Sequence, residues 1–471
     1  MARTVDVAIV GAGTAGLSAL REVRGVTEEF VIINAGDWGT TCAARGCMPS
    51  KALIEAVNAF HRRHDFVAFG IGGSDGLSID VPSVLARVRR LRDGFASGPR
   101  SKPEQLGERA VSGRARLIGP DRLEVNGEQI VARRIVLAPG SVPVMPKSWA
   151  AFGDRILTTD TLYEQPDLPR RIAVVGLGAI GLEMAQALAR LGLEVTAFDA
   201  LHRVGGVDDP EVATALHERI AREFPVHLGT QVELEETDGQ ISVAWADDSV
   251  EVDAVLAAMG RRPNLDGLGL ETLGVTLDER GLPPVDSETL QVADLPIFLA
   301  GDANGDRPIL HEAADEGHIA GRNAAAEQVQ AHCRRTPLSI VFSDPQLARV
   351  GTPLSSLDPE HTVVGSADFT RQARARTAER AVGLLRVYGD RQTGRLLGAE
   401  MAIPAAEHIG HLLALAIEQK LTVQQVLAMP FYHPVIEEGL RGALRQIAKK
   451  TPQAGASDLS TCPEVGYEAL D

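Results

Sequence analysis

The chain has 471 residues, of which 44% are hydrophobic and 23% are charged, and its formal net charge is −16 at pH 7. This length exceeds one ordinary hydrophobic core, so we expect two to four domains. The negative charge argues against a nucleic acid or an anionic membrane as partner, because both would require a cationic surface. No apolar run approaches the ~18 residues of a membrane-spanning helix. The first residues enter an apolar segment directly, so no signal peptide is expected, and four cysteines in so long a chain favour a cytoplasmic protein.

The first predicted element is the strand VDVAIV, followed by the glycine pattern G-x-G-x-x-G and a helical pattern. Its glycines are Gly11, Gly13 and Gly16. Such a strand–turn–helix unit presents a helix N-terminus to a pyrophosphate. The next predicted strand, FVII, ends at Asn34, where a dinucleotide-binding unit carries a polar residue.

Two of the four cysteines, Cys42 and Cys47, follow in the stretch WGTTCAARGCMPSK. A zinc site is disfavoured, because the pair supplies two ligands and no second metal-binding pair accompanies it. A structural disulfide would close a short loop worth only about 2 kcal/mol. In a regular helix the two Cα atoms would lie roughly 8–9 Å apart, beyond the ~7 Å limit for a disulfide. A bond therefore requires a distorted turn, which Gly46 permits and the Met48–Pro49 step favours. A strained disulfide is easily reduced, so we expect a redox couple.

The glycine pattern recurs in RRIAVVGLGAIGLEM, with Gly176, Gly178 and Gly181, and its second strand ends at Asp199. Two such units are stronger evidence for dinucleotide binding than one. A carboxylate at this position accepts a hydrogen bond from a ribose 2′-hydroxyl and repels a 2′-phosphate, which favours NAD over NADP. The neighbouring His202 and Arg203 leave some use of NADP open.

Further along the chain, AAMGRRPN predicts a strand broken at Gly260. LPIFLAGDA predicts a buried strand that ends at Asp302, followed by a helix near Leu310. Predicted strands around 338–351 and 382–401 precede two helical stretches at 404–419 and 434–449, which is typical of a separate α+β domain. The last residues, 451–471, lack periodicity and are expected to form a tail.

The last candidate is His433, which precedes Pro434 in FYHPVIEEGL. We expect the proline to hold His433 extended and to start the helix. A histidine at a helix mouth is often a cap or a core residue. Disulfide exchange, however, requires thiol deprotonation near pH 7, while a free thiol has a pKa of about 8.5. Imidazole is the side chain suited to that step, which favours a catalytic base.

These motifs, in this order, resemble those of the class I pyridine nucleotide–disulfide oxidoreductases, and among them the dihydrolipoamide dehydrogenases most closely. The resemblance covers nearly the whole chain. It implies an α/β fold with two Rossmann-like dinucleotide-binding domains, an FAD domain interrupted by an NAD domain, and a C-terminal α+β dimerisation domain. The implied boundaries are FAD domain 1–148, NAD domain 149–264, second FAD part 265–335, dimer interface 336–450 and tail 451–471.

The resemblance also implies the cofactor sites. In the FAD site, the first glycine set approaches the pyrophosphate, and Thr41 lies beside it. Ala115 would lie near the adenine and Asp302 at the ribityl chain. The helix from Leu310 would point at the flavin. Asn34 stands where the family usually has a glutamate for the FAD ribose. For NAD, the second glycine set and Asp199 are completed by Val232 and Gly260. Lys51 is expected near the flavin's reactive edge, paired with Glu183; alternatively both are ordinary surface residues. No metal is expected.

The implied reaction is oxidation of a lipoyl-carrying protein. His433, oriented by Glu438, would deprotonate a dithiol that attacks Cys42, and Cys47 would pass the electrons through FAD to NAD⁺. In the family this histidine serves the disulfide of the other subunit, which implies a homodimer.

Several residues depart from the family pattern. Asn34 lacks the charge of a glutamate, and Pro139 removes a backbone donor from the usual A-T-G turn, so both bear on FAD affinity. Tyr432 and the residues around the cysteines point to an unusual carrier. Cys462 is taken as incidental and Cys333 as structural. Rival hypotheses are an NAD(P)H-dependent reductase of another disulfide, an NADH oxidase or transhydrogenase, and a non-enzymatic assembly subunit.

Overall fold

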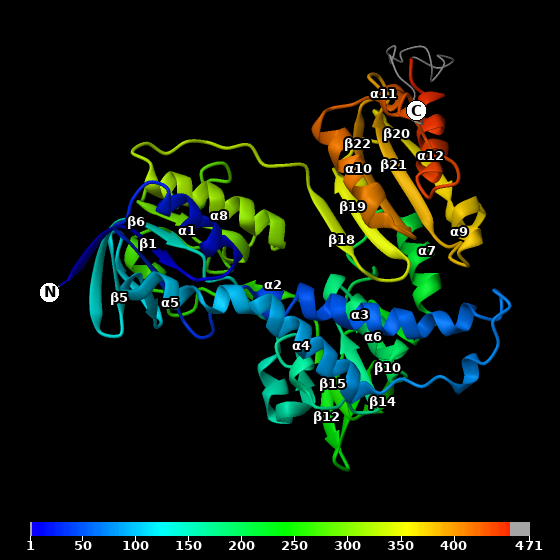
Figure 1. Cartoon of the computed structure of the whole chain (residues 1–471), viewed down its shortest axis with the longest axis horizontal. Helices are drawn as coiled ribbons and strands as arrows, with labels where there is room; N and C mark the ends of the chain where they lie inside the picture. Colours follow the sequence, from blue (N-terminus) through cyan, green and yellow to red (C-terminus); the bar gives the residue numbers. More distant parts are fainter. Residues whose placement is uncertain (1, 453–471) are drawn as a thin grey trace. The chain divides into compact units, whose positions relative to one another are not determined.

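The structure is a computed structural model and describes residues 2–452. These residues form two compact units, each assembled from segments far apart in sequence (Figure 1). The first unit holds Met1–Leu53, Asp80–Leu168 and Met259–Arg334; the second holds Ile54–Ile79, Pro169–Ala258 and the chain from Arg335 onward. The predicted tail, with Cys462, lies outside the described residues apart from Thr451 and Pro452.

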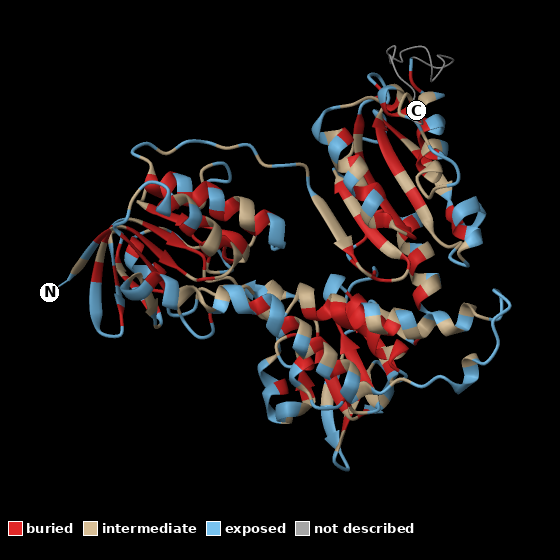
Figure 2. Ribbon diagram, viewed as in Figure 1, coloured by how far each residue is buried: buried red, intermediate tan, exposed pale blue. Residues whose placement is uncertain are grey.

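The first unit is built on a mainly parallel sheet. At its centre β1 (Arg3–Val10) lies between β2 (Phe30–Asn34) and β6 (Glu128–Leu137). The sheet is extended by β3 (Ala110–Ser112), β17 (Ile297–Leu299), β4 (Ala115–Gly119) and β5 (Arg122–Val125), the last two antiparallel. The central strands are buried on both faces, as expected for parallel strands covered by other elements (Figure 2).

Two helices pack together against this sheet, α1 (Thr14–Arg24) and α8 (Leu310–Ala325). Their close approach depends on glycines of α8. A Cβ at Gly317 would lie 2.1 Å from the carbonyl oxygen of Ala15, and one at Gly321 would lie 2.6 Å from the Cα of Ala19. The remaining elements of this unit include α2 (Thr41–Ala44), α4 (Val81–Arg100), α5 (Lys102–Leu106), β7 (Ser141–Pro143) and β16 (Arg261–Pro263). The helix α3 (Cys47–His61) begins in the first unit and ends in the second.

The second unit contains another parallel sheet, in the order β11-β10-β9-β15, beside an antiparallel meander β12-β13-β14. Its elements are β9 (Arg171–Val175), α6 (Ala179–Arg190), β10 (Glu194–Asp199), α7 (Pro210–Ile220), β11 (Val226–Leu228), β12 (Glu233–Thr237), β13 (Gln240–Trp245), β14 (Asp248–Val252) and β15 (Ala254–Ala257). On α6, Arg190 forms a buried two-bond ion pair with Glu223, with both N–O distances 2.8 Å.

The C-terminal part of this unit is a five-stranded antiparallel sheet in the order β18-β19-β22-β21-β20, with helices packed on its core. Its elements are β18 (Leu338–Val341), β19 (Gln346–Gly351), β20 (Thr362–Asp368), α9 (Ala373–Thr377), β21 (Leu384–Asp390), β22 (Leu396–Ile403), α10 (Ala406–Glu418), α11 (Val423–Leu427) and α12 (Glu438–Ala448). Two Rossmann-like sheets and a C-terminal α+β part confirm the predicted fold class.

Two local predictions are wrong. The last helix begins at Glu438 and not at Pro434, because residues before it form a turn in which the Glu438 carboxylate accepts the N–H of Val435 at 3.2 Å. The helix break near the cysteines falls at Arg45 and Gly46, while Pro49 sits inside the first turn of α3, where a proline needs no backbone donor. No helix among the described residues is long and apolar enough to cross a membrane.

Candidate active site

Both glycine loops are shaped by close backbone contact. Gly11 has φ +105°, and a Cβ there would lie 2.1 Å from the carbonyl oxygen of Ala138; a Cβ at Gly16 would lie 1.9 Å from that of Gly11. The second loop repeats the geometry, because Gly176 has φ +94° and a Cβ at Gly181 would lie 1.7 Å from its carbonyl oxygen. In both loops the outer glycines are therefore required by the fold itself.

The middle glycine of each loop, in contrast, faces open space. A Cβ at Gly13 or Gly178 would meet nothing within 4 Å. Each of these residues is the N-cap of its helix, α1 or α6, and makes no side-chain capping bond, so the first helical N–H groups remain available to an acceptor. Free N–H groups beside open space at a helix N-terminus fit a bound pyrophosphate, which supports one dinucleotide at each loop.

The polar residues that end β2 and β10 hold these loops in place. Asn34 Oδ1 accepts the N–H of Ala12 at 3.0 Å, and its amide donates to the carbonyl of Asp37 at 2.9 Å. Asp199 does the same in the repeat, because its Oδ2 accepts the N–H of Leu177 at 2.5 Å. Asn34 therefore keeps the structural role of the acidic residue, while it brings no negative charge to a ribose.

The basic residues after Asp199 are engaged locally. Arg203 Nη1 lies 3.0 Å from Asp208 Oδ1, and a Cβ on Gly229 would overlap the imidazole ring of His202. The other Asp199 oxygen, Oδ1, accepts the N–H of Leu201 at 2.7 Å. A paired arginine offers less to a 2′-phosphate than a free one, so the geometry favours NAD.

The two central cysteines flank the break between α2 and α3. Thr40 caps α2 by accepting the N–H of Ala43 at 3.1 Å, and the chain then turns at Gly46. A Cβ at Gly46 would lie 3.3 Å from the Thr41 carbonyl oxygen and 3.5 Å from the Cα of Cys42. This turn places Cys47 back beside Cys42, as expected from the sequence.

No disulfide joins Cys42 and Cys47 in the structure, and the two thiols interact directly. The hydrogen bond from Cys47, followed by burial, raises the pKa of the Cys42 thiol, while the charge of Lys51 acts in the opposite direction. Because the two thiols share a hydrogen bond, the first deprotonation of the pair is easier than the second, and the pair holds a single negative charge more readily than two. Such a pair is chemically suited to form and open a disulfide.

His433 and Glu438 form the second reactive group. The imidazole Nδ1 lies 3.0 and 3.1 Å from the two Glu438 carboxylate oxygens. The hydrogen bond with His433 lowers the pKa of Glu438. The His433 side chain is 73% exposed, so its ring can meet a group from outside this chain. A carboxylate on one ring nitrogen leaves Nε2 to accept a proton.

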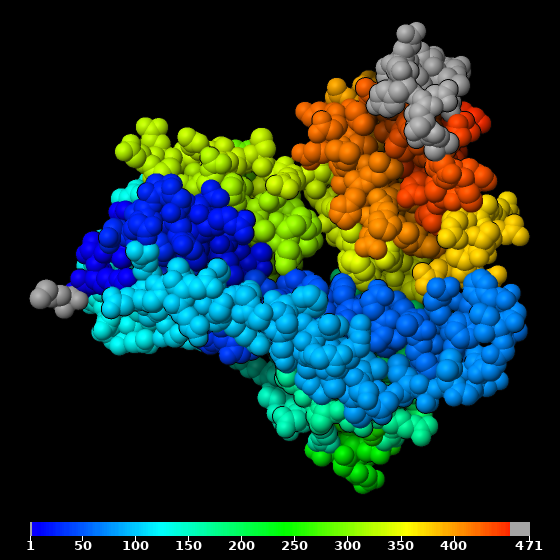
Figure 3. All heavy atoms as spheres, viewed as in Figure 1, coloured from blue at the N-terminus to red at the C-terminus, as the bar shows by residue number. Residues whose placement is uncertain are grey.

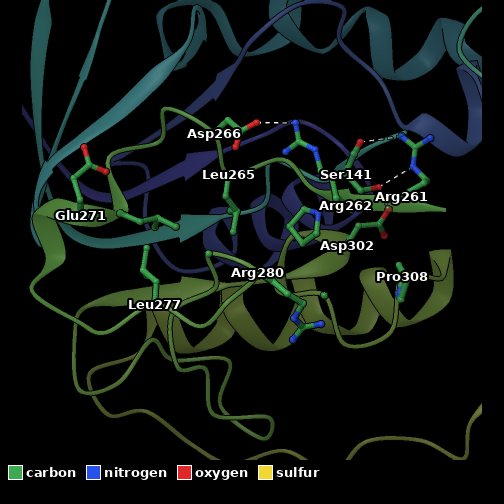
Figure 4. Close-up of a pocket in the computed structure, with 14 residues that line it drawn as sticks. Ser141, Arg261, Arg262, Leu265, Asp266, Glu271, Leu277, Arg280, Asp302 and Pro308 are labelled. Carbon is green, nitrogen blue, oxygen red and sulfur yellow. Dashed lines mark hydrogen bonds and ion pairs between the residues drawn. The ribbon is translucent and has the colours of Figure 1, made fainter. Parts of the chain in front are cut away.

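Asp302 lies in a short helical turn, three residues beyond the end of β17 at Leu299, whereas the sequence predicted a strand that ends at Asp302 itself. Its Oδ2 accepts the Ser141 hydroxyl at 2.6 Å, and Arg261 Nε donates to the same hydroxyl at 2.9 Å. A pocket of about 520 Å³ opens beside these groups. Figure 4 shows Ser141, Arg261 and Asp302 at one side of it, with Arg262 paired to Asp266.

The turn that carries Asp302 is fixed by a buried carboxylate that the sequence did not indicate. Glu316 of α8 is fully buried and accepts the N–H of Gly301 at 2.6 Å and the Asn304 amide at 2.7 Å, with Arg334 at 2.7 Å on its other oxygen. Burial raises the pKa of Glu316. Ser141 and Arg261 were also missed, although Arg261 stands in the GRRPN motif.

The remaining predicted residues have the following places. Leu310 is the first residue of α8, Ala115 is buried at the start of β4, and Thr41 starts α2. Glu183 is buried on α6 and accepts the N–H of Phe342 at 2.9 Å. Val232 lies between β11 and β12, and Gly260 has φ +97° between β15 and β16. Their contacts with cofactors, and the Lys51–Glu183 pair, stay predictions.

One further residue bears on an earlier expectation. Cys333 is exposed, so the prediction of a structural role is wrong, since an exposed thiol packs in no core. Within residues 2–452, no group of three or more His, Cys, Asp or Glu side chains could hold a metal ion.

Two family models match the chain. Residues 5–317 match the pyridine nucleotide-disulphide oxidoreductase model, and residues 338–444 match the dimerisation domain of the same family. Dihydrolipoyl dehydrogenase of Thermus scotoductus is 31% identical over 461 residues, with 95% of this chain and 98% of that protein covered. The enzyme of the same name from Synechocystis is 30% identical over 470 residues, with 94% and 98% covered.

Solved structures agree on the fold. LpdA from Mycobacterium tuberculosis superimposes with a TM-score of 0.82 at 26% identity, covering 94% of this chain and all of that one. The Cu(II) complex of the HOCl-induced flavoprotein disulfide reductase RclA from Escherichia coli gives 0.81 at 22% identity, covering 94% and 99%, a likeness of fold. The chain therefore belongs to the pyridine nucleotide-disulphide oxidoreductase family, is most like dihydrolipoamide dehydrogenase, and uses FAD and NAD(H) as cofactors.

Proposed function

We propose that this protein is a dihydrolipoamide dehydrogenase that oxidises protein-bound dihydrolipoyl groups through a Cys42–Cys47 disulfide and FAD, and reduces NAD⁺. The observation that carries the proposal is the direct contact of the two thiols across the helix break. The match to a dimerisation domain supports a homodimer, and four cysteines in 471 residues support a cytoplasmic location.

The first steps need only protein side chains, with the base and the disulfide supplied by different subunits of the homodimer. His433 takes the proton from one thiol of the substrate, while Glu438 holds the imidazole and stabilises its charge. The substrate thiolate attacks the Cys42 sulfur of the disulfide, and Cys47 leaves as a thiolate. The second substrate thiol then attacks the mixed disulfide and displaces Cys42. The substrate leaves as a disulfide, and both cysteines are left reduced.

FAD, when bound, would accept the two electrons of the dithiol and deliver them as hydride to NAD⁺. The glycine loops at Gly13 and Gly178 would bind the pyrophosphates of FAD and NAD. Asn34 and Asp199 would bind their riboses, and Asp302 would bind the ribityl chain. We assign Cys47 as the sulfur nearer the flavin and Lys51, paired with Glu183, as the nearby cation. The other proposed contacts are Thr41, Ala115 and Leu310 for FAD, and Val232 and Gly260 for NAD.

The proposal is tested by steady-state turnover of the purified, FAD-loaded protein. We expect the protein to reduce NAD⁺ with dihydrolipoamide. The kcat/KM for dihydrolipoamide should exceed the kcat/KM for glutathione disulfide, measured with NADH as reductant, by at least an order of magnitude. Turnover of glutathione disulfide alone, or of neither substrate, would refute it.

A second candidate is an NAD(P)H-dependent reductase of another disulfide. Tyr432, directly before the base, is 78% exposed and would line the substrate approach with an aromatic ring. The same comparison separates the two candidates, because this one predicts low activity with dihydrolipoamide.

A further inference from the structure

Four exposed arginines lie close together on one short segment of this acidic chain, which also carries the exposed Asp368 and Glu379. Between Asp368 and Arg380 the chain forms the short turn Phe369–Arg371 and the helix α9. Four arginines of this segment are exposed, and we name them the arginine surface: Arg371, Arg374, Arg376 and Arg380. The whole chain, by contrast, carries a net charge of −16.

The charges of the arginine surface are hardly neutralised within the chain. Arg371, 90% exposed, has its Nε 3.9 Å from Asp368, at the limit of an ion pair. Arg374 donates to the Thr377 hydroxyl, which is uncharged, at 3.0 Å. Among residues 2–452, neither Arg376 nor Arg380 forms an ion pair. Arg374, Arg376 and Arg380, exposed and without an ion pair among these residues, therefore remain available to an external anion.

The arginine surface is joined to the segment that carries the proposed base. Gln372 is buried, and its Nε2 donates to the Val435 carbonyl at 2.7 Å while its Oε1 accepts the N–H of Ala375 at 2.6 Å. The buried Phe369 ring lies so close to Gly439 that a Cβ there would be 2.4 Å from a ring atom. These contacts hold the arginine segment and the His433–Glu438 turn as neighbours. Figure 3 shows the arginine segment, in yellow, beside α12 in red.

We propose that the arginine surface docks an acidic carrier domain that brings its dithiol to His433. This inference rests on the proposed function and adds the chemistry of the carrier. A carrier with a negative face would be repelled by the net charge of this chain and attracted by the arginine surface, so the local charge would orient it beside His433. Such attraction acts over roughly 10 Å at 0.1 M salt. A small neutral dithiol would need no such surface.

The test compares two substrates on the FAD-loaded, full-length protein. One is a recombinant lipoyl domain of net negative charge carrying a dihydrolipoyl-lysine, and the other is free dihydrolipoamide. The variant is R376E/R380E. The matched control is R24E/R395E, which reverses two exposed arginines, one in the other unit and one at the β21–β22 turn, the end of β21 remote from α9.

With the lipoyl domain we expect R376E/R380E to lower kcat/KM about tenfold or more at low salt, with a weakened salt dependence, while R24E/R395E changes it less than twofold. With dihydrolipoamide both variants should match the wild type. An equal loss with both substrates, or no loss with the lipoyl domain, would overturn the docking proposal. So would a change of oligomeric state on sedimentation, which would assign this surface to a second copy of the chain. Failure of the wild type to oxidise dihydrolipoamide would instead refute the proposed function.

Discussion

The glycine loops allow a prediction in which two neighbouring, chemically identical changes have opposite effects. In Gly16→Ala the new methyl group would lie 1.9 Å from the backbone carbonyl oxygen of Gly11. Backbone cannot give way cheaply, so we expect a loss of stability of about 3 kcal/mol or more. In Gly13→Ala the methyl group meets nothing within 4 Å, so the fold should lose less than about 1 kcal/mol.

The effect on FAD is reversed. The methyl group of Gly13→Ala would stand in the space next to the first N–H groups of α1, where the pyrophosphate is expected. Losing one or two charge-assisted hydrogen bonds of about 1.5–3 kcal/mol each would weaken FAD binding roughly 10²-fold or more.

The assay is thermal unfolding of the FAD-free protein together with titration by FAD, followed through flavin fluorescence. We expect Gly13→Ala to unfold near the wild-type temperature and to bind FAD poorly. A matched control is Gly178→Ala, which should spare FAD and raise the KM for NAD⁺. Wild-type FAD affinity in Gly13→Ala would refute the assignment of this loop to the pyrophosphate.

Three further predictions concern the reactive groups and one buried ion pair. Cys42→Ser should abolish oxidation of dihydrolipoamide while NADH-dependent reduction of a dye persists, and Cys333→Ser should leave both rates unchanged; full activity of Cys42→Ser would contradict its role. Glu438→Gln should lower kcat for dihydrolipoamide by about 10²-fold because His433 loses its orienting carboxylate, with the KM for NAD⁺ unchanged as the check on folding. Burial disfavours the charged form of Glu223, but hydrogen bonds and charge from its arginine partner outweigh burial and lower its pKa. The stability it contributes is thus present above its unfolded pKa of 4.5 and lost as pH falls through the lower folded value. Glu223→Gln should therefore cost about 2–3 kcal/mol at pH 7, measured by urea unfolding, and progressively less in acid; a cost that grew in acid would contradict the sign.

The parts of the fold that follow local rules were predictable from sequence. The two glycine patterns and the strands that end at Asn34 and Asp199 lie where expected, because a tight strand–turn–helix requires glycine at fixed spacing. The turn at Gly46 follows from the same kind of local geometry. The mistaken helix start at Pro434 shows the limit of such rules. Proline is compatible with a first helical turn, but the Glu438 side chain stabilises a competing turn before the helix.

The buried polar groups were not predictable, since they join segments far apart in sequence. Glu316 holds the Gly301 turn and pairs with Arg334, and Ser141 links Asp302 to Arg261. No periodicity or spacing marks such contacts, because each side chain is ordinary in its own segment. They become recognisable only once the fold has brought those segments together.

The central claim is that the two sulfurs at the start of α2 and α3 exchange electrons with a flavin. The most direct measurement is the absorption spectrum of the FAD-loaded protein as dihydrolipoamide is added without oxygen. The predicted result is a long-wavelength band from a thiolate against the flavin that appears in the wild type on addition, is already there before addition in Cys42→Ser, and is absent in Cys47→Ser. Bleaching of the flavin with no such band in the wild type, or a band that survives in Cys47→Ser, would contradict the account.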